Sequence, residues 1–183
     1  MNDSKITVRY AKALFSLAKE KQLLDDIKKD MTLVYSVCND IDEFSLLLES
    51  PVIKPSKKLS IINTIFKNKI NDISLSFLKL VIKNRRDNYL KLISLNFIDF
   101  YKKSKGIKTV VLTSAVELDK DLKTKIIDQI KKSLKTEIEL SEKVDKDILG
   151  GFILRIEDKQ IDASISTKLK NIKQKLINTS IDK

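Results

Sequence analysis

The sequence is nearly free of residues that interrupt regular structure, because its 183 residues include only 3 Gly and 2 Pro. Both prolines, Pro51 and Pro55, lie in one short connector. Gly and Pro are the strongest local breakers of helices and strands, so their scarcity favours long regular segments over a loop-rich barrel or sandwich. Up to residue 105, apolar residues recur at spacings of three and four, the period of an amphipathic helix. We therefore expect a mostly helical chain.

Residues 1–105 predict a bundle of amphipathic helices joined by short links. Five or six segments are expected: 7–21, 23–38, a short helix through Leu48 capped by Asp40 or Asp42, a helix from Ser56 or Lys57 to Lys67, one capped by Asn71 or Asp72, and one carrying Leu90, Ile93, Phe97, Phe100 and Tyr101.

Two of these helices carry apolar residues on two sides. In helix 7–21, Val8 and Phe15 form a second strip beside the main row of Tyr10, Ala11, Leu14, Leu17 and Ala18. In helix 72–84, the row expected to face inward is Ile73, Phe77, Leu80, Val81 and Asn84. A further row is formed by Leu75, Leu78 and Ile82. A helix that is apolar on two sides must be covered on two sides. Side by side, the pair would form a groove for the apolar face of a partner helix.

The pattern changes at Lys105-Gly106, where we place a boundary between a helical domain (1–105) and a small α+β domain (106–183). A strand is expected from Ile107 to Thr113, then a helix capped by Asp119, then a strand from Thr136 to Leu140. The remaining expected elements are a strand 152–156 opened by Gly150-Gly151, a hairpin turn at Glu157-Asp158-Lys159 leading into Gln160-Ile161, and a last helix with Ile165, Leu169, Ile172 and Leu176 on one face.

The chain lacks the residues that most enzymes use. It has no His and one Cys, so it cannot form a Ser-His-Asp or Cys-His nucleophile or a Cys/His zinc site. Gly150-Gly151 lacks the spacing and the following Lys-Ser/Thr of a phosphate-binding loop. Cys38 lies in an apolar helix pattern typical of a small buried side chain. We expect no catalytic residue, no metal site and no cofactor.

The net charge of +11 points toward acidic partners, nucleic acid or an anionic membrane surface. Residues 1–105 contain 20 of the 36 Lys and Arg and 12 of the 25 Asp and Glu, a net charge of +8, against +3 for residues 106–183. Only four of the basic residues are Arg, which readers of bases and phosphates prefer. Two alternatives stay open at this point: a basic nucleic-acid-binding α+β protein and a generic helical adaptor.

No signal peptide or membrane span is expected from the pattern. The first ten residues contain no apolar core of signal-peptide length. The longest uncharged run, 31–39, falls well short of the roughly 20 residues that a membrane helix needs.

Three motifs occur in an order that resembles a known family. Residues 9–18 read Arg-Tyr-Ala-Lys-Ala-Leu-Phe-Ser-Leu-Ala, and Asn84-Arg85-Arg86 follows near the end of the bundle. The third is Gly150-Gly151, a strand, a hairpin and Asp162-x-Ser164 before the last helix. They are similar to the Tyr-Ala-x-Ala-Leu/Phe helix, the Asn-x-Arg turn and the Gly-Gly…Asp-x-Ser signature of the ATP synthase delta subunit family. That family includes the mitochondrial oligomycin-sensitivity-conferring protein.

The resemblance implies a non-catalytic stator subunit of the peripheral stalk in the rotary proton-translocating ATP synthase. In that family an N-terminal six-helix bundle binds N-terminal helices of the alpha subunits on the catalytic head. The C-terminal domain holds the C-terminal ends of the b subunits of the stalk. It further implies a peripheral location at the cytoplasmic face of the bacterial inner membrane, where the protein contacts the membrane only through the complex. No nucleic-acid partner is implied.

Carried over by position, the family's head-binding groove corresponds to six residues: Tyr10, Ala13, Leu14, Phe77, Leu80 and Val81. The motif positions expected to be structural are Asn84, Arg86, Gly150, Gly151, Asp162 and Ser164. For the stalk contact the resemblance indicates only the C-terminal domain and its last helix. Our hypothesis for the charge is that the +8 bundle is steered toward acidic helices. One departure is Glu157, where relatives usually have Gly, which leaves the type of that turn open.

Overall fold

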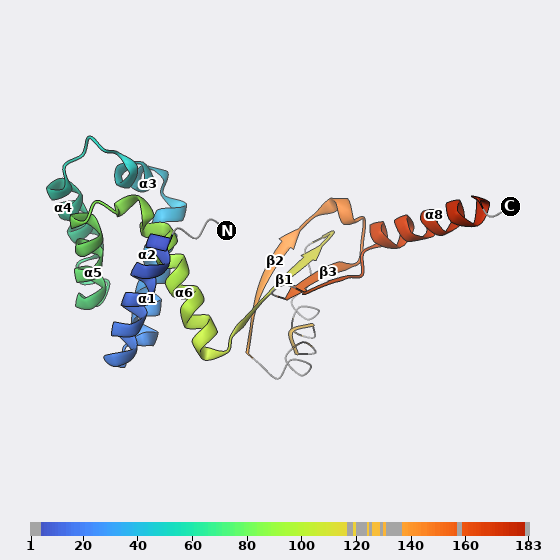
Figure 1. Ribbon diagram of the computed structural model, residues 1–183, viewed down its shortest axis with the longest axis horizontal. Helices are drawn as coiled ribbons and strands as arrows, with labels where there is room; N and C mark the ends of the chain where they lie inside the picture. Colours follow the sequence, from blue (N-terminus) through green and yellow to red (C-terminus); the bar gives the residue numbers. More distant parts are fainter. Residues whose placement is uncertain are drawn as a thin grey trace. The chain divides into compact units, whose positions relative to one another are not determined.

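The computed structural model describes residues 5–116, 119, 124, 126–128, 130, 137–156 and 159–181. The chain divides into two compact units, Met1–Ser104 and Lys105–Lys183. In Figure 1 the first unit is a set of packed helices and the second contains a sheet and a long C-terminal helix.

The first unit is the helical bundle that the periodicity predicts. Its helices are α1 (Lys5–Glu20), α2 (Leu24–Asp40), α3 (Asp42–Glu49), α4 (Pro55–Phe66), α5 (Asp72–Lys83) and α6 (Leu90–Lys105), with a 3-10 turn at Asp87–Tyr89. The core is built from fully buried side chains of most of these helices, the largest being Phe66, Phe97, Leu14, Ile27, Met31 and Ile62.

Helix starts follow local chemistry, with one correction. Asn71 caps α5 as predicted, because its side chain accepts a hydrogen bond of 2.9 Å from the backbone N–H of Ile73. The predicted Asp cap of α3 is wrong, since the residue at the cap position is Ile41 and it makes no side-chain cap bond. Asp42 instead lies in the first turn, where a carboxylate is favoured by the helix dipole. Helix α4 begins at Pro55, whose fixed φ suits the first helical position.

The two apolar rows of α5 face in directions that differ from the prediction. Leu75, Leu78 and Ile82, expected to be the additional row, are buried in the core together with Val81. From the row expected to point inward, Leu80 is 50% exposed and Asn84 is exposed. Both rows satisfy the helical period, so the period alone does not tell which row meets the core.

Two buried polar links tie elements of the bundle together. Lys58, on α4, forms an ion pair with Asp87 and donates a 2.6 Å hydrogen bond to the carbonyl of Leu48. On α2, Asp30 accepts hydrogen bonds from the Ser74 hydroxyl at 2.6 Å and from the Asn71 N–H at 3.0 Å. The second link fixes the start of α5 against α2.

The second unit contains a four-stranded sheet among the described residues, with strand order β2-β1-β3-β4. Its elements are β1 (Lys108–Ser114), β2 (Ile138–Val144), β3 (Phe152–Ile156), β4 (Lys159–Asp162) and α8 (Ile165–Ile181). Strand β1 pairs parallel with β2 and antiparallel with β3. The predicted hairpin is confirmed by the antiparallel pairing of β3 with β4.

A small core of Val110, Leu112, Leu154 and Ile130 covers one side of this sheet. The helix predicted after Asp119 lies largely outside the described residues, including its Leu122 and Leu134. Ile126 and Ile130 are helical and pack in this core. The turn at 157–158 also lies outside the described residues.

Candidate functional site

A groove of about 300 Å³ runs between α1 and α5. It is lined by Arg9, Tyr10, Ala13, Leu14, Leu17, Phe77 and Leu80. The structure thus brings together five of the six predicted groove residues. Val81 does not line the groove, because it is fully buried in the core behind it. The sequence-based prediction missed Arg9 and Leu17, although Leu17 follows Tyr10 and Ala13 at helical spacings of seven and four.

Aromatic and polar contacts hold the two groove helices together. The rings of Tyr10 and Phe77 meet edge to face with centroids 6.4 Å apart. The Tyr10 hydroxyl also accepts a 3.1 Å hydrogen bond from Asn84 Nδ2. Leu14 (1% exposed) and Phe77 (9%) belong to the floor, whereas Leu17 (40%) and Leu80 (50%) leave much of their surface to solvent. The groove is therefore an apolar surface that a partner side chain can fill.

Asn84, Arg85 and Arg86 end α5 beside this groove. Arg85 has a left-handed φ of 53°, and the N–H groups of Arg85 and Arg86 bond the carbonyls of Ile82 and Val81. This is a Schellman motif, which satisfies carbonyls at the end of a helix. The turn frees the Asn84 side chain to reach Tyr10, so this motif helps to fix the groove.

The Gly-Gly and Asp-x-Ser motifs meet at the start of α8. A side chain at Gly151 would place its Cβ 2.4 Å from the carbonyl oxygen of Ala163, and the residue has a φ of 76°. The N–H of Ile165 bonds the Gly150 carbonyl at 3.0 Å. Glycine suits position 151 best, because the close approach leaves no room for a Cβ and the positive φ strains a residue that has one.

Asp162 and Ser164 shape the first turn of α8. The Ser164 hydroxyl accepts a hydrogen bond from the Thr167 N–H, which makes Ser164 the cap of the helix. The carboxylate of Asp162 accepts hydrogen bonds from the hydroxyl and the N–H of Ser164 and from the hydroxyl of Thr167. These bonds lower the pKa of Asp162 below its ordinary value, and those from Ser164 have the larger effect. These hydrogen bonds fix the first turn of α8.

A second apolar surface lies on the α+β unit. Ile165, Leu169 and Ile172 of α8 are 46, 53 and 54% exposed and follow one another at spacings of four and three. Leu149, Phe152 and Ile161, which precede α8 in the chain, are exposed as well. An exposed apolar helix row of this kind is typical of a surface that packs against another chain.

The chemistry of the described residues offers little for catalysis. No group of three or more His, Cys, Asp or Glu able to hold a metal occurs in the part of the chain that the structure describes. Burial raises the pKa of the Cys38 thiol to about 11, and Lys91 offsets this only in part. Such a thiol is a poor nucleophile at neutral pH. Within the described ranges, no helix is both long and apolar enough to cross a membrane.

Together these features define a two-unit, mostly helical class of protein that exposes an apolar, helix-sized surface on each unit. The family model of the ATP synthase delta (OSCP) subunit matches residues 6–176. The chain is 34% identical to ATP synthase subunit delta of Christiangramia forsetii over 184 aligned positions, and 33% identical to that of Cytophaga hutchinsonii over 182, with full coverage of both chains in each case.

A chain in the cryo-EM structure of the Toxoplasma gondii mitochondrial ATP synthase hexamer has the same fold. It superposes with a TM-score of 0.78 at 22% identity, covering 95% of this chain and 98% of that one. The chain belongs to the ATP synthase delta (OSCP) subunit family. It is a structural, non-catalytic subunit of the peripheral stalk, and the nucleic-acid-binding alternative finds no support.

Proposed function

We propose that the subunit clamps the catalytic head of the ATP synthase to its peripheral stalk and resists rotation of the head. The helical unit, residues 1–105, binds N-terminal helices of the alpha subunits in the groove between α1 and α5. The α+β unit, residues 106–183, binds the C-terminal ends of the b subunits. The complex places it at the cytoplasmic face of the bacterial inner membrane. The observation that carries the proposal is the apolar groove with its half-exposed Leu17 and Leu80.

The shape and chemistry of the groove suit an amphipathic helix. Such a helix presents apolar anchors at i, i+3, i+4 and i+7, and these fill an apolar trough between two helices. Full burial of one leucine side chain stabilises a complex by about 1.5 to 3 kcal/mol relative to an exposed one. Leu17 and Leu80 start half-exposed, so each supplies part of that value when a partner covers it.

The exposed row of α8 supports the second contact. Ile165, Leu169 and Ile172 lie on one helix with spacings that match the face of a partner helix. On the helical unit, the hollow lined by the connector 50–55 is a less suitable binding site for an amphipathic helix than the groove. Charged residues such as Glu49, Lys54 and Arg85 border it.

Binding of an alpha-subunit N-terminal peptide to the full-length protein tests the proposal, measured by isothermal titration calorimetry. Leu17→Asp places a charge in the groove, and Ala13→Trp fills part of it. We expect either variant to weaken binding at least tenfold. Leu14→Asp is unsuitable for this test, since Leu14 is 1% exposed and its replacement would unfold the bundle.

Leu92→Asp is the matched control. Leu92 is 41% exposed against 40% for Leu17, and it lies on α6 outside the groove. We expect this variant to bind the peptide like the original protein. Equal loss of binding in Leu17→Asp and Leu92→Asp, or no binding by the unaltered protein, would contradict the proposal.

A further inference from the structure

The two helices that form the groove carry only basic charges along its length. There is no acidic residue from Lys5 to Lys19 on α1 and none in residues 73–86, which contain α5 and its terminal turn. The basic residues of these stretches are Lys5, Arg9, Lys12, Lys19, Lys79, Lys83, Arg85 and Arg86. A partner helix therefore meets an apolar floor with cationic borders.

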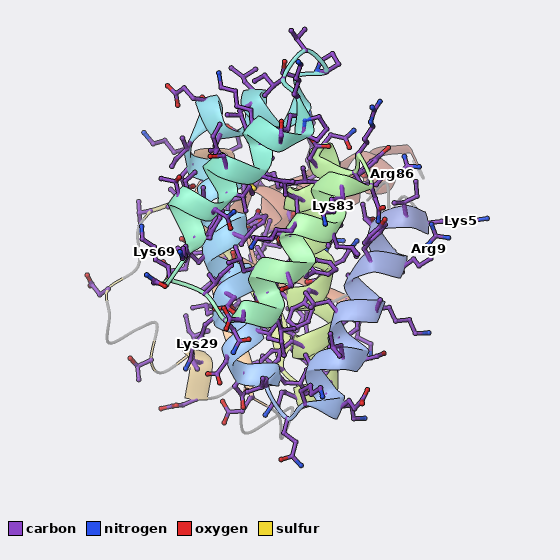
Figure 2. The ribbon with its side chains drawn as sticks, turned by 90° about the vertical axis from the view of Figure 1, so that its left-hand side faces the viewer. Lys5, Arg9, Lys29, Lys69, Lys83 and Arg86 are labelled. Carbon is purple, nitrogen blue, oxygen red and sulfur yellow. The ribbon has the colours of Figure 1, made fainter. Side chains whose placement is uncertain are left out.

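The cations gather at one end of the groove. Figure 2 shows Lys5 and Arg9 on α1, and Lys83 and Arg86 at the end of α5, on the two sides of the groove where the described part of α1 starts and α5 ends. The hydrogen bond between Asn84 and Tyr10 joins the two helices at this same end. All four basic side chains are exposed, and Arg9 also lines the groove. Among the residues that the structure describes, none of the four has a carboxylate partner in an ion pair.

In the described residues of α1 and α5, acidic side chains lie only at the opposite end of each helix, and Asp87, which follows Arg86, is buried and paired with Lys58. Glu20 closes α1 and Asp72 opens α5. Twelve residues of helix span about 18 Å, which is well beyond the screening length of about 8 Å at physiological ionic strength. Glu20 and Asp72 therefore do not neutralise the cations at the far end.

We infer that the helix bound in this groove carries Asp or Glu side chains at the end that lies beside Lys5, Arg9, Lys83 and Arg86. The inference rests on the proposed function, because it describes the occupant of the same groove. The apolar floor supplies most of the affinity, whereas the four cations select an acidic helix end and disfavour a basic one. They also favour one lengthwise position of the helix, since four of the eight basic residues lie at this end.

A double-mutant cycle with the full-length protein and designed peptides tests the inference. The first peptide is an amphipathic helix of about 20 residues with Leu and Ile anchors and glutamates confined to its first turn. The second replaces these glutamates with glutamine. The protein variant is Lys5→Gln/Lys83→Gln, which removes two exposed cations that do not line the groove and no buried contact of the core. The cycle also cancels the effect of the glutamates on the peptide's own helicity.

We expect the variant to bind the glutamate peptide about three- to tenfold more weakly than the unaltered protein, and the glutamine peptide with unchanged affinity. The coupling should disappear at about 1 M salt, where the screening length is about 3 Å. The coupling is the ratio of the affinity losses that the variant causes for the two peptides. A ratio below about 1.5 would overturn the inference, because an exposed ion pair typically contributes more than that.

Lys29→Gln/Lys69→Gln is the matched control, because it removes the same charge from residues that Figure 2 shows away from the groove. An equal loss in this control would mean that net charge alone acts, and would also overturn the inference. Failure of the proposed function would give a different pattern of results. In that case neither peptide responds to Leu17→Asp, whereas a failed inference leaves that response intact and removes only the charge coupling.

Discussion

At the scale of single residues, the ion pair of Lys58 and Asp87 is a feature that the sequence pattern does not reveal. The two side chains come from α4 and from the 3-10 turn before α6, and their residues are 5 and 9% exposed. Lys58 also bonds the carbonyl at the end of α3, so one ammonium group satisfies two acceptors. In the sequence, Lys58 is indistinguishable from the many exposed lysines around it.

Lys58→Met should destabilise the helical unit by about 3 to 5 kcal/mol, because it leaves the Asp87 carboxylate buried without its partner. Urea unfolding followed by tyrosine fluorescence measures this, since all 4 Tyr lie within residues 1–105. Lys29→Met is the control: its ion pair with Asp26 is 3.5 Å long and exposed, so its loss should cost about 1 kcal/mol at most. Similar values for both variants would contradict the assignment.

Cys38 should react slowly with thiol reagents in the folded protein. Burial raises the pKa of its thiol from 9.0 to about 11, so near pH 8 the folded protein should hold about a hundredfold less thiolate than the unfolded chain. Between pH 9 and 11 the unfolded chain releases this proton first, so stability should fall by about 1.4 kcal/mol per pH unit. Iodoacetamide labelling with and without urea measures the first effect. Equal labelling rates would disprove it.

At the scale of elements, α5 shows how one helix serves both the core and the groove. Its buried row of Leu75, Leu78 and Ile82 anchors it, and Leu80 on another face borders the groove. Periodicity correctly predicted that α5 has two apolar rows. Which row faces inward depends on how α1, α2 and α4 surround α5, and that is a property of packing rather than of spacing.

The junction between β3 and α8 is the second element-scale feature. Gly151→Ala should destabilise the α+β unit by about 2 to 4 kcal/mol, because it adds a clash with Ala163 to the strain of a positive φ. Gly106→Ala is the control, since Gly106 has a similar φ of 69° but nothing within 4 Å of the added Cβ, so about 1 kcal/mol is expected.

Hydrogen exchange of peptides from β3 measures the cost of both glycine variants, because it reports local opening of this unit. A Gly151→Ala variant with β3 protection equal to that of Gly106→Ala would show that the close approach to Ala163 is relieved without cost.

At the scale of the whole molecule, each of the two compact units exposes its own apolar helix surface, as a clamp with two partners requires. The net charge is divided unequally between residues 1–105 and 106–183, so we expect electrostatic steering to act mainly through the helical unit. Tight binding through broad helix packing needs no reactive side chains, which agrees with a chain that has no His.

Leu169→Asp should weaken binding to the soluble part of the b subunits at least tenfold while leaving the alpha-peptide affinity unchanged. The reason is that Leu169 is 53% exposed at the centre of the α8 row. Co-sedimentation or calorimetry with the b-subunit segment measures it. Asn171→Asp introduces the same charge about half a turn away and should have little effect. A loss of alpha-peptide binding in Leu169→Asp would contradict the division of roles between the units.

The sequence by itself determined the helical bundle, the change of structure at Lys105-Gly106, the β3–β4 hairpin and the family. These depend on local periods, capping residues and short motifs, which act over a few neighbouring positions. Tertiary structure decided that Val81 belongs to the core and Leu17 to the groove, that Lys58 is buried, and that four cations share one end of the groove. These depend on contacts between residues far apart in the chain, which no local pattern encodes.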